Sequence, residues 1–148
     1  AVELGLIYPE HKEMPKMLHN DSHKFESGFV NVTIEPNNSV MLKSLAGSRL
    51  GIWIAHGEGK FGLPYAETEY NIPIKYSYDV YPANPNGSPF AAAAICSKDG
   101  RHLAMMPHLE RAIYPWNWAY YEEGRGGDEV SPWIEAFVNA RKWIQAKK

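Results

Sequence analysis

The sequence has one cysteine, no long apolar run and no surplus of positive charge. A lone cysteine, Cys96, cannot form an internal disulfide, which argues against a secreted, disulfide-stapled domain. No apolar stretch approaches the roughly 20 residues that a membrane span needs. Lys and Arg number 15 against 17 Asp and Glu, so clustered positive charge that would attract nucleic acid or anionic lipid is missing. We therefore expect a cytoplasmic protein whose partners include no nucleic acid and no membrane.

The apolar residues that are present, 45% of a 148-residue chain, suffice for the core of one ordinary domain. Apolar and polar residues alternate over residues 29–34 and 74–80, the pattern of half-buried strands. A short strand is also expected at residues 39–42. The nearly continuous apolar run at residues 50–55 is typical of a strand covered on both faces.

The second half of the chain predicts a hairpin and then a helix. Residues 90–96 should form a buried strand, and the Asp-Gly pair at 99–100 favours a tight turn into a returning strand at 101–106. Ser131 is expected as the N-cap of a helix with Pro132 at its first position. Apolar residues at helical spacing, expected to share its buried face, are Trp133, Phe137, Ala140 and Ile144. Lys147 and Lys148 suit its C-terminal end.

The candidate catalytic residues are His108 and Glu110, which follow the returning strand. Residues two apart on an extended backbone point to the same side, so the carboxylate can contact the imidazole. Such a carboxylate orients the ring and stabilises the imidazolium that forms when the other ring nitrogen accepts a proton from a nucleophile. A His-x-Glu pair is also common on solvated strand edges, so spacing alone leaves both interpretations open.

The nucleophile that such a base would serve is not evident in this chain. Cys96, the one thiol, lies in the apolar sequence at residues 90–96, where a thiolate is disfavoured. It also lacks the Gly-x-Cys-x-Gly surround of a nucleophile on a sharp strand-to-helix turn. We expect Cys96 to be a buried core residue.

A metal site is the weaker alternative, suggested by His19 and His23 with Asp21 between them. Residues 20–22 favour a turn over a helix, and no third ligand is evident, so we expect solvated loop histidines and no metal. The many tyrosines and tryptophans leave open a stand-alone binding or regulatory domain that never had a nucleophile.

Four segments, in order, resemble the glutamine amidotransferase domain of phosphoribosylformylglycinamidine synthases. Residues 105–111, Met-Met-Pro-His-Leu-Glu-Arg, are similar to the signature Met-Pro-His-Pro-Glu-Arg of that family, although Leu109 replaces a frequent Pro. Residues 55–60, Ala-His-Gly-Glu-Gly-Lys, resemble its Ser-His-Gly-Glu-Gly-Arg segment. Residues 81–89 resemble its proline-rich loop, and residues 131–142 its terminal helix. The resemblance covers essentially all 148 residues.

The resemblance implies an α/β, flavodoxin-like class I amidotransferase fold, of which residues 1–148 would be the strand-rich C-terminal part with its closing helix. It implies that His108 and Glu110 assist a cysteine in hydrolysing glutamine. The nucleophile elbow and the oxyanion-hole glycines lie upstream in the family. Residues 1–7 enter apolar sequence without an N-cap and read as the end of an upstream element, with Gly5 as a helix C-cap, although removal of an initiator Met is the alternative. We therefore expect this chain alone to be inactive.

The family's partners follow from the same resemblance. Ammonia would pass to a synthetase domain that uses ATP and Mg and amidates formylglycinamide ribonucleotide in purine biosynthesis, so this chain itself would need no cofactor. His56 and the loop at residues 84–88 would shape the site or meet the synthetase domain, with turn scaffolding as the alternative. No individual substrate-binding residue is predicted.

Overall fold

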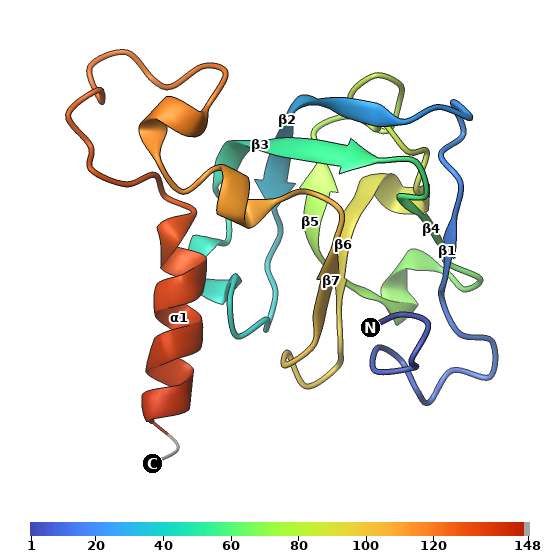
Figure 1. The fold of residues 1–148 in the computed structure, drawn as a ribbon. Coiled ribbons are helices and arrows are strands. Elements are labelled where there is room, and N and C mark those ends of the chain that lie inside the picture. The colour runs from blue at the N-terminus through green and yellow to red at the C-terminus, as the bar shows by residue number, and fades with distance from the viewer. Residues whose placement is uncertain (147–148) are drawn as a thin grey trace.

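The computed structural model describes residues 1–146 and shows a curled sheet with one helix on its flank (Figure 1). The strands are β1 Lys16–Leu18, β2 Glu26–Ile34, β3 Arg49–His56, β4 Lys60–Gly62, β5 Asn71–Tyr76, β6 Ala92–Cys96 and β7 Leu103–Met105. Single 3-10 turns are η1 Lys43–Leu45, η2 Glu67–Glu69, η3 Pro89–Ala91, η4 Leu109–Arg111 and η5 Pro115–Asn117, and the α-helix is α1 Ile134–Gln145. Within residues 1–146, no helix has the length and apolar character to cross a membrane.

The main sheet has the strand order β3-β2-β5-β6-β7, and β1 and β4 form a separate two-stranded ribbon. Every pairing between these named strands is antiparallel. A strand-rich fold with a C-terminal helix is confirmed. The α/β fold that the resemblance implies has a largely parallel central sheet, whereas no pairing between the named strands of residues 1–146 is parallel.

The sheet curls until its two edges approach each other beyond β7. After β7 the chain crosses to β3, where the backbone N–H of His108 donates to the carbonyl of Trp53 at 2.8 Å in an isolated antiparallel bridge. We call this contact between the two sheet edges the seam. It brings a residue from the end of the hairpin beside the middle of β3.

Most predicted strands are confirmed, with shifted ends. Residues 29–34 lie in β2, residues 50–55 in β3 and residues 92–96 of the expected 90–96 in β6, and the hairpin turn before β7 is present. Of the strand expected at residues 74–80, only residues 74–76 lie in a strand, because β5 ends at Tyr76. β3 is less covered than expected, since its residues Trp53 and Ala55 are only half-buried.

The strand expected at residues 39–42 is wrong. The side chain of Asn37 accepts the backbone N–H of Ser39 at 2.9 Å, which turns the chain at this point. The Ser39 carbonyl then accepts the backbone N–H groups of Leu42 and Lys43 in a helical turn that leads into η1. A local asparagine hydrogen bond therefore overrides the short apolar pattern.

Two hydrophobic clusters cover the sheet, and β6 is buried along its whole length. The N-terminal segment packs in the smaller cluster through Val2, Ile7 and Tyr8. Residues 1–6 have the hydrogen bonds of a Schellman helix end: Leu6 N–H donates to the Ala1 carbonyl and Gly5 N–H to that of Val2. Gly5 has the positive φ, +65°, that its expected role as a helix C-cap requires, although residues 2–5 form a turn and not a helix.

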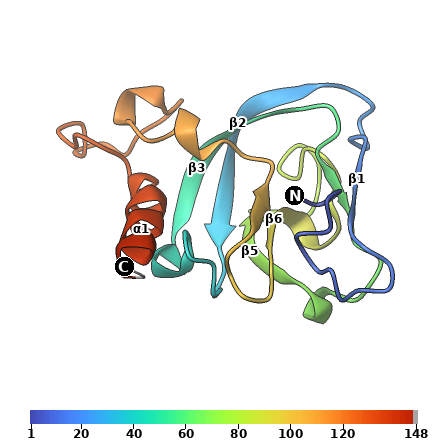
Figure 2. The ribbon, with the colours of Figure 1, turned by 60° about the horizontal axis from the view of Figure 1, so that its bottom comes forward.

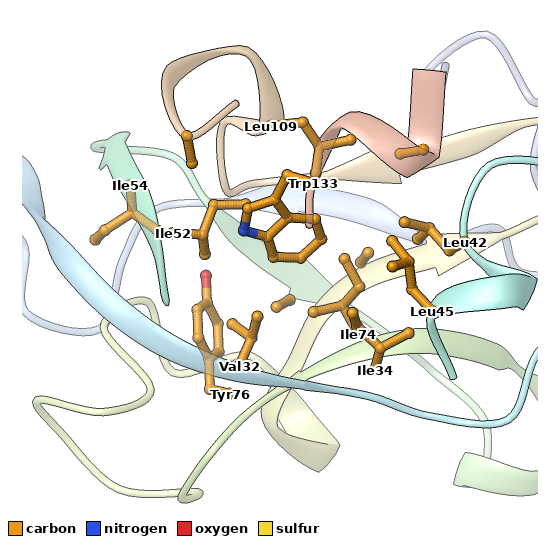
Figure 3. Packing of buried hydrophobic residues seen from close by; sticks show 14 of the residues in the cluster. Val32, Ile34, Leu42, Leu45, Ile52, Ile54, Ile74, Tyr76, Leu109 and Trp133 are labelled. Atoms are coloured by element: carbon orange, nitrogen blue, oxygen red, sulfur yellow. The ribbon is translucent and has the colours of Figure 1, made fainter. Parts of the chain in front are cut away.

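The helix α1 stands on one flank of the sheet (Figures 1 and 2). The α-helix begins at Ile134 with Trp133 as its N-cap, so the N-cap expected at Ser131 is wrong. The Ser131 hydroxyl oxygen accepts the backbone N–H of Trp133 at 3.2 Å in the turn just before the helix. Trp133 is fully buried and its indole lies in the centre of the larger cluster (Figure 3).

The expected buried face of this helix is wrong beyond its first turn. Phe137 is 40% exposed and Ile144 56% exposed. An open hollow of about 450 Å³, lined by Leu103, Ala140 and Ile144 among others, lies between the later turns and the β6–β7 hairpin. Only the start of the helix therefore reaches the core. Lys147 and Lys148 lie outside the described residues.

Candidate active site

His108 and Glu110 contact each other directly. The Nδ1 atom of His108 lies 2.8 Å from an Oε1 oxygen of Glu110, and the same oxygen lies 3.7 Å from Nε of Arg111. The contact that the spacing predicted is therefore confirmed. Because a carboxylate can only accept here, Nδ1 carries a proton, and in the neutral ring Nε2 of His108 keeps a lone pair.

The seam fixes the position of this pair. The backbone of His108 is held to Trp53 of β3, and Glu110 follows within η4, where the buried Leu109 anchors the turn in the larger cluster. The side chain of His108 is 29% exposed and that of Glu110 62% exposed. The pair is thus built on rigid backbone and remains accessible from outside.

An open hollow of about 430 Å³ adjoins the pair. Its lining includes Glu110 and Arg111 from the η4 turn, Ser27 and Trp53 from neighbouring strands, and Asn117 of η5. Ser27 lies opposite Ala55, and Phe29 opposite Trp53, so these side chains and the hollow share one face of the β2–β3 pair.

His56 lies at the end of β3 on the other face of that strand pair, which faces the core. Its carbonyl accepts the amide group of Asn20 at 2.7 Å, and its Nδ1 atom lies 3.2 Å from Oδ1 of the same side chain. Because that amide also donates to the Lys24 carbonyl, its orientation is fixed, and Oδ1 must accept from Nδ1–H. Nε2 of His56 is then a buried acceptor, without a hydrogen-bond partner among residues 1–146.

Burial lowers the pKa of His56 below its ordinary value of 6.5, and the nearby His108 lowers it further. A backbone hydrogen bond and the carboxylate of Glu26, directly across the strand pair, raise this pKa, but each does so less than burial lowers it. His56 is therefore a neutral imidazole near neutral pH. Its ring also packs against Gly59, where a Cβ atom would lie 2.5 Å from the ring, so this turn needs glycine.

A pH dependence of stability follows from the lowered pKa of His56. As the pH falls below about 6.5, the unfolded chain binds a proton at this histidine while the folded chain does not, so the free energy of unfolding decreases. Urea unfolding at pH 7.5 and 5.5 should show a smaller decrease for His56→Gln than for the unchanged chain. The exposed His19→Gln is the matched control and should keep the full decrease. Equal decreases in all three would contradict this prediction.

The loop at residues 84–88 supports the His56 turn. The Asn86 amide donates to the Gly59 carbonyl at 2.7 Å, and the Ser88 hydroxyl accepts the backbone N–H of Phe61 at 3.0 Å. Asn84 closes the loop on itself by donating to the Ser88 carbonyl. Of the two interpretations left open by the sequence, these contacts favour turn scaffolding.

Cys96 is fully buried, as expected, and burial raises the pKa of its thiol. It pairs with Leu103 at the end of the hairpin beside the Ser97–Gly100 turn, whereas His108 follows the opposite end of β7. This placement gives Cys96 the surroundings of a core residue.

The histidines of the suggested metal site lie in a turn. His19 faces Glu58 at 3.7 Å, and Asp21 forms an ion pair with Lys60 at 2.6 Å. The backbone N–H of His23 donates to the Asn20 carbonyl, so the turn expected here is confirmed. Among residues 1–146 no three His, Cys, Asp or Glu side chains gather as metal ligands would.

Asn20 is the site residue that sequence reasoning missed. It is fully buried, and its one side chain connects the His56 carbonyl, the His56 ring and the backbone N–H of Gly59. It stands in a polar stretch with the composition of a solvated loop, so no local signal distinguishes it.

A family model of the CobB/CobQ-like glutamine amidotransferase domain matches residues 2–144 of the chain. The probable phosphoribosylformylglycinamidine synthase, chloroplastic/mitochondrial, of Arabidopsis thaliana is 42% identical over 146 residues, which are 89% of this chain and 10% of that protein. The human phosphoribosylformylglycinamidine synthase is 42% identical over 137 residues, 84% of this chain and 10% of that protein. The chain spans about a tenth of the length of the curated relatives it matches.

The fold is also similar to a solved one. The structure of PurLQS from Thermotoga maritima superposes with a TM-score of 0.64 at 26% identity, over 89% of this chain and 54% of that one. The similarity therefore extends over nearly the whole of residues 1–146.

Proposed function

This chain belongs to the CobB/CobQ-like glutamine amidotransferase domain family, and we propose on that basis that it forms part of the glutaminase domain of a phosphoribosylformylglycinamidine synthase. The domain would hydrolyse glutamine and supply ammonia for the ATP-dependent amidation of formylglycinamide ribonucleotide in purine biosynthesis. The observation that carries this proposal is the 2.8 Å contact between His108 and Glu110 beside an open hollow.

In the proposed reaction, Nε2 of His108 accepts the proton of a cysteine thiol, and the thiolate attacks the side-chain amide carbon of glutamine. The imidazolium, held by Glu110, then gives its proton to the departing nitrogen, so that ammonia leaves and a γ-glutamyl thioester remains. Water, deprotonated by the same histidine, cleaves the thioester and returns the thiol. Glu110 stays ionised throughout and fixes the ring.

We propose that residues 1–148 are the C-terminal part of this domain in a longer protein, called the parent protein below. The nucleophilic cysteine and the oxyanion hole would be supplied upstream, and the sites for ATP, Mg and the ribonucleotide would lie in a synthetase domain. The buried position of Cys96 supports a nucleophile from elsewhere. We place the parent protein in the cytosol, a reducing compartment in which its thiol would stay active.

The proposal is tested by glutamate release from glutamine. The parent protein should release glutamate, and Cys96→Ala should leave the rate unchanged, because this thiol is buried away from His108. The 148-residue chain alone should release none at neutral pH. No release from the parent protein would contradict the proposed function, and release from the short chain that Cys96→Ala abolishes would overturn the nucleophile assignment.

A further inference from the structure

Two aromatic side chains beside the site stack on each other in solvent. The ring centroids of Tyr114 and Trp116 lie 4.4 Å apart with planes inclined by only 7°. Trp116 is nevertheless 73% exposed and Tyr114 38% exposed. An ordered, flat apolar surface of this kind is typical of a protein contact, because aromatic rings lose little conformational entropy when a partner covers them. We call this pair the aromatic platform.

The aromatic platform is connected rigidly to the catalytic pair. The turn that carries Trp116 is closed by a backbone hydrogen bond from Asn117 to Tyr114. The Asn117 carbonyl accepts the indole N–H of Trp53, and the Trp53 carbonyl in turn accepts the backbone N–H of His108. Asn117, which follows Trp116 in the chain, lines the hollow that also exposes Glu110, so the platform is one residue away from that hollow.

The loop that follows the aromatic platform is acidic. Residues 119–130 contain four carboxylates and one basic residue, Arg125, which is itself paired with Asp128 at 2.7 Å. A partner that covers both the platform and this loop therefore meets net negative charge. Its own rim should be basic, and its centre apolar enough to receive an indole.

The proposed chemistry requires a partner at this place. Ammonia released beside His108 is lost to solvent by protonation and diffusion unless the exit from the site is covered. The cover must lie at the mouth of the hollow, and the platform directly precedes Asn117, one of the residues that line it. The loop at residues 84–88, by contrast, contacts the His56 turn through the Asn86 amide, which donates to the Gly59 carbonyl.

We propose that Tyr114 and Trp116 anchor the synthetase domain of the parent protein, through an apolar recess with a basic rim, over the mouth of the His108–Glu110 site. This inference rests on the proposed glutaminase function. Trp116 is the central anchor, and Tyr114 holds its ring in the docked orientation. The contact's purpose is to keep ammonia production and amidation coupled.

The test uses the parent protein with Trp116→Ala. The number of glutamine molecules hydrolysed per amidated product should rise severalfold, because truncating a central aromatic anchor weakens docking about 30-fold or more. Amidation supported by ammonium salts and the melting temperature should stay unchanged. Trp116→Tyr, which keeps a ring on the platform, should restore most of the coupling, and Tyr120→Ala, also 73% exposed in the same segment, should not disturb it.

Two results would overturn the proposal. An unchanged ratio of hydrolysis to product in a folded Trp116→Ala variant would show that nothing docks on this ring. A parallel loss of hydrolysis, of ammonium-supported amidation and of melting temperature would show that the platform belongs to the packing of the glutaminase domain itself. Failure of the underlying function is distinguishable, since the unmodified parent protein would then release no glutamate.

Discussion

Replacing His108 with alanine is expected to lower glutamine-dependent amidation by the parent protein about a thousandfold, within the 10²- to 10⁴-fold range of a lost general base. Without the imidazole, neither the thiol proton nor the departing nitrogen has a partner. Amidation supported by ammonium salts should be unaffected, because it bypasses this site. Both rates can be measured by product formation with each nitrogen source.

Two further variants test the same catalytic role. Glu110→Gln should also lower the glutamine-dependent rate by about 10²-fold or more, since a neutral amide can donate to Nδ1 and favour the wrong tautomer. The double variant should be little worse than His108→Ala alone, because the carboxylate acts through the ring. His102→Ala, a histidine at the start of the same hairpin strand, is the control. Unimpaired use of glutamine by His108→Ala would refute the assigned role.

Truncation of Trp133 should produce the largest loss of stability, about 3–5 kcal/mol in the free energy of unfolding. The indole is fully buried between Ile52, Ile74 and Leu109 in the larger cluster (Figure 3), and alanine would leave a cavity there. It also donates its N–H to the Gly51 carbonyl at 2.8 Å, and so holds α1 to β3. Urea unfolding followed by circular dichroism measures the loss.

The variant Trp133→Phe separates the contribution of core packing from that of the hydrogen bond to the Gly51 carbonyl. Phenylalanine fills most of the space but leaves the Gly51 carbonyl without its donor, which should cost about 1–3 kcal/mol. Phe137→Ala, at an exposed position of the same helix, should change stability far less. A loss below about 1 kcal/mol for Trp133→Ala would mean that the core closes without the indole.

Local patterns in the sequence predicted the parts of the fold that local forces determine. The Asp-Gly turn and the apolar residues 92–96 form the expected hairpin. His108 and Glu110 make the expected contact, but through the 3-10 turn η4 and not through the extended backbone that the prediction assumed. The strand expected at residues 39–42 failed because the Asn37 side chain competes with strand pairing there.

Tertiary contacts determine what the sequence could not predict. Helical spacing placed Phe137 and Ile144 on the same face as Trp133, but only the first turn of α1 meets the core. The spacing of apolar residues cannot predict at which residue a helix stops packing against the sheet. The role of Asn20 depends on contacts with residues about 36 positions away. The catalytic role of His108 stays a prediction, which the variants above address.

The seam also bears on how the sheet avoids self-association. Exposed strand edges invite pairing with another molecule, and the backbone of His108 covers one carbonyl of the β3 edge. This protection uses the main-chain N–H and not the imidazole. Any residue except proline keeps this hydrogen bond, so the proposed proton transfer and the protection of the strand edge depend on different atoms of His108.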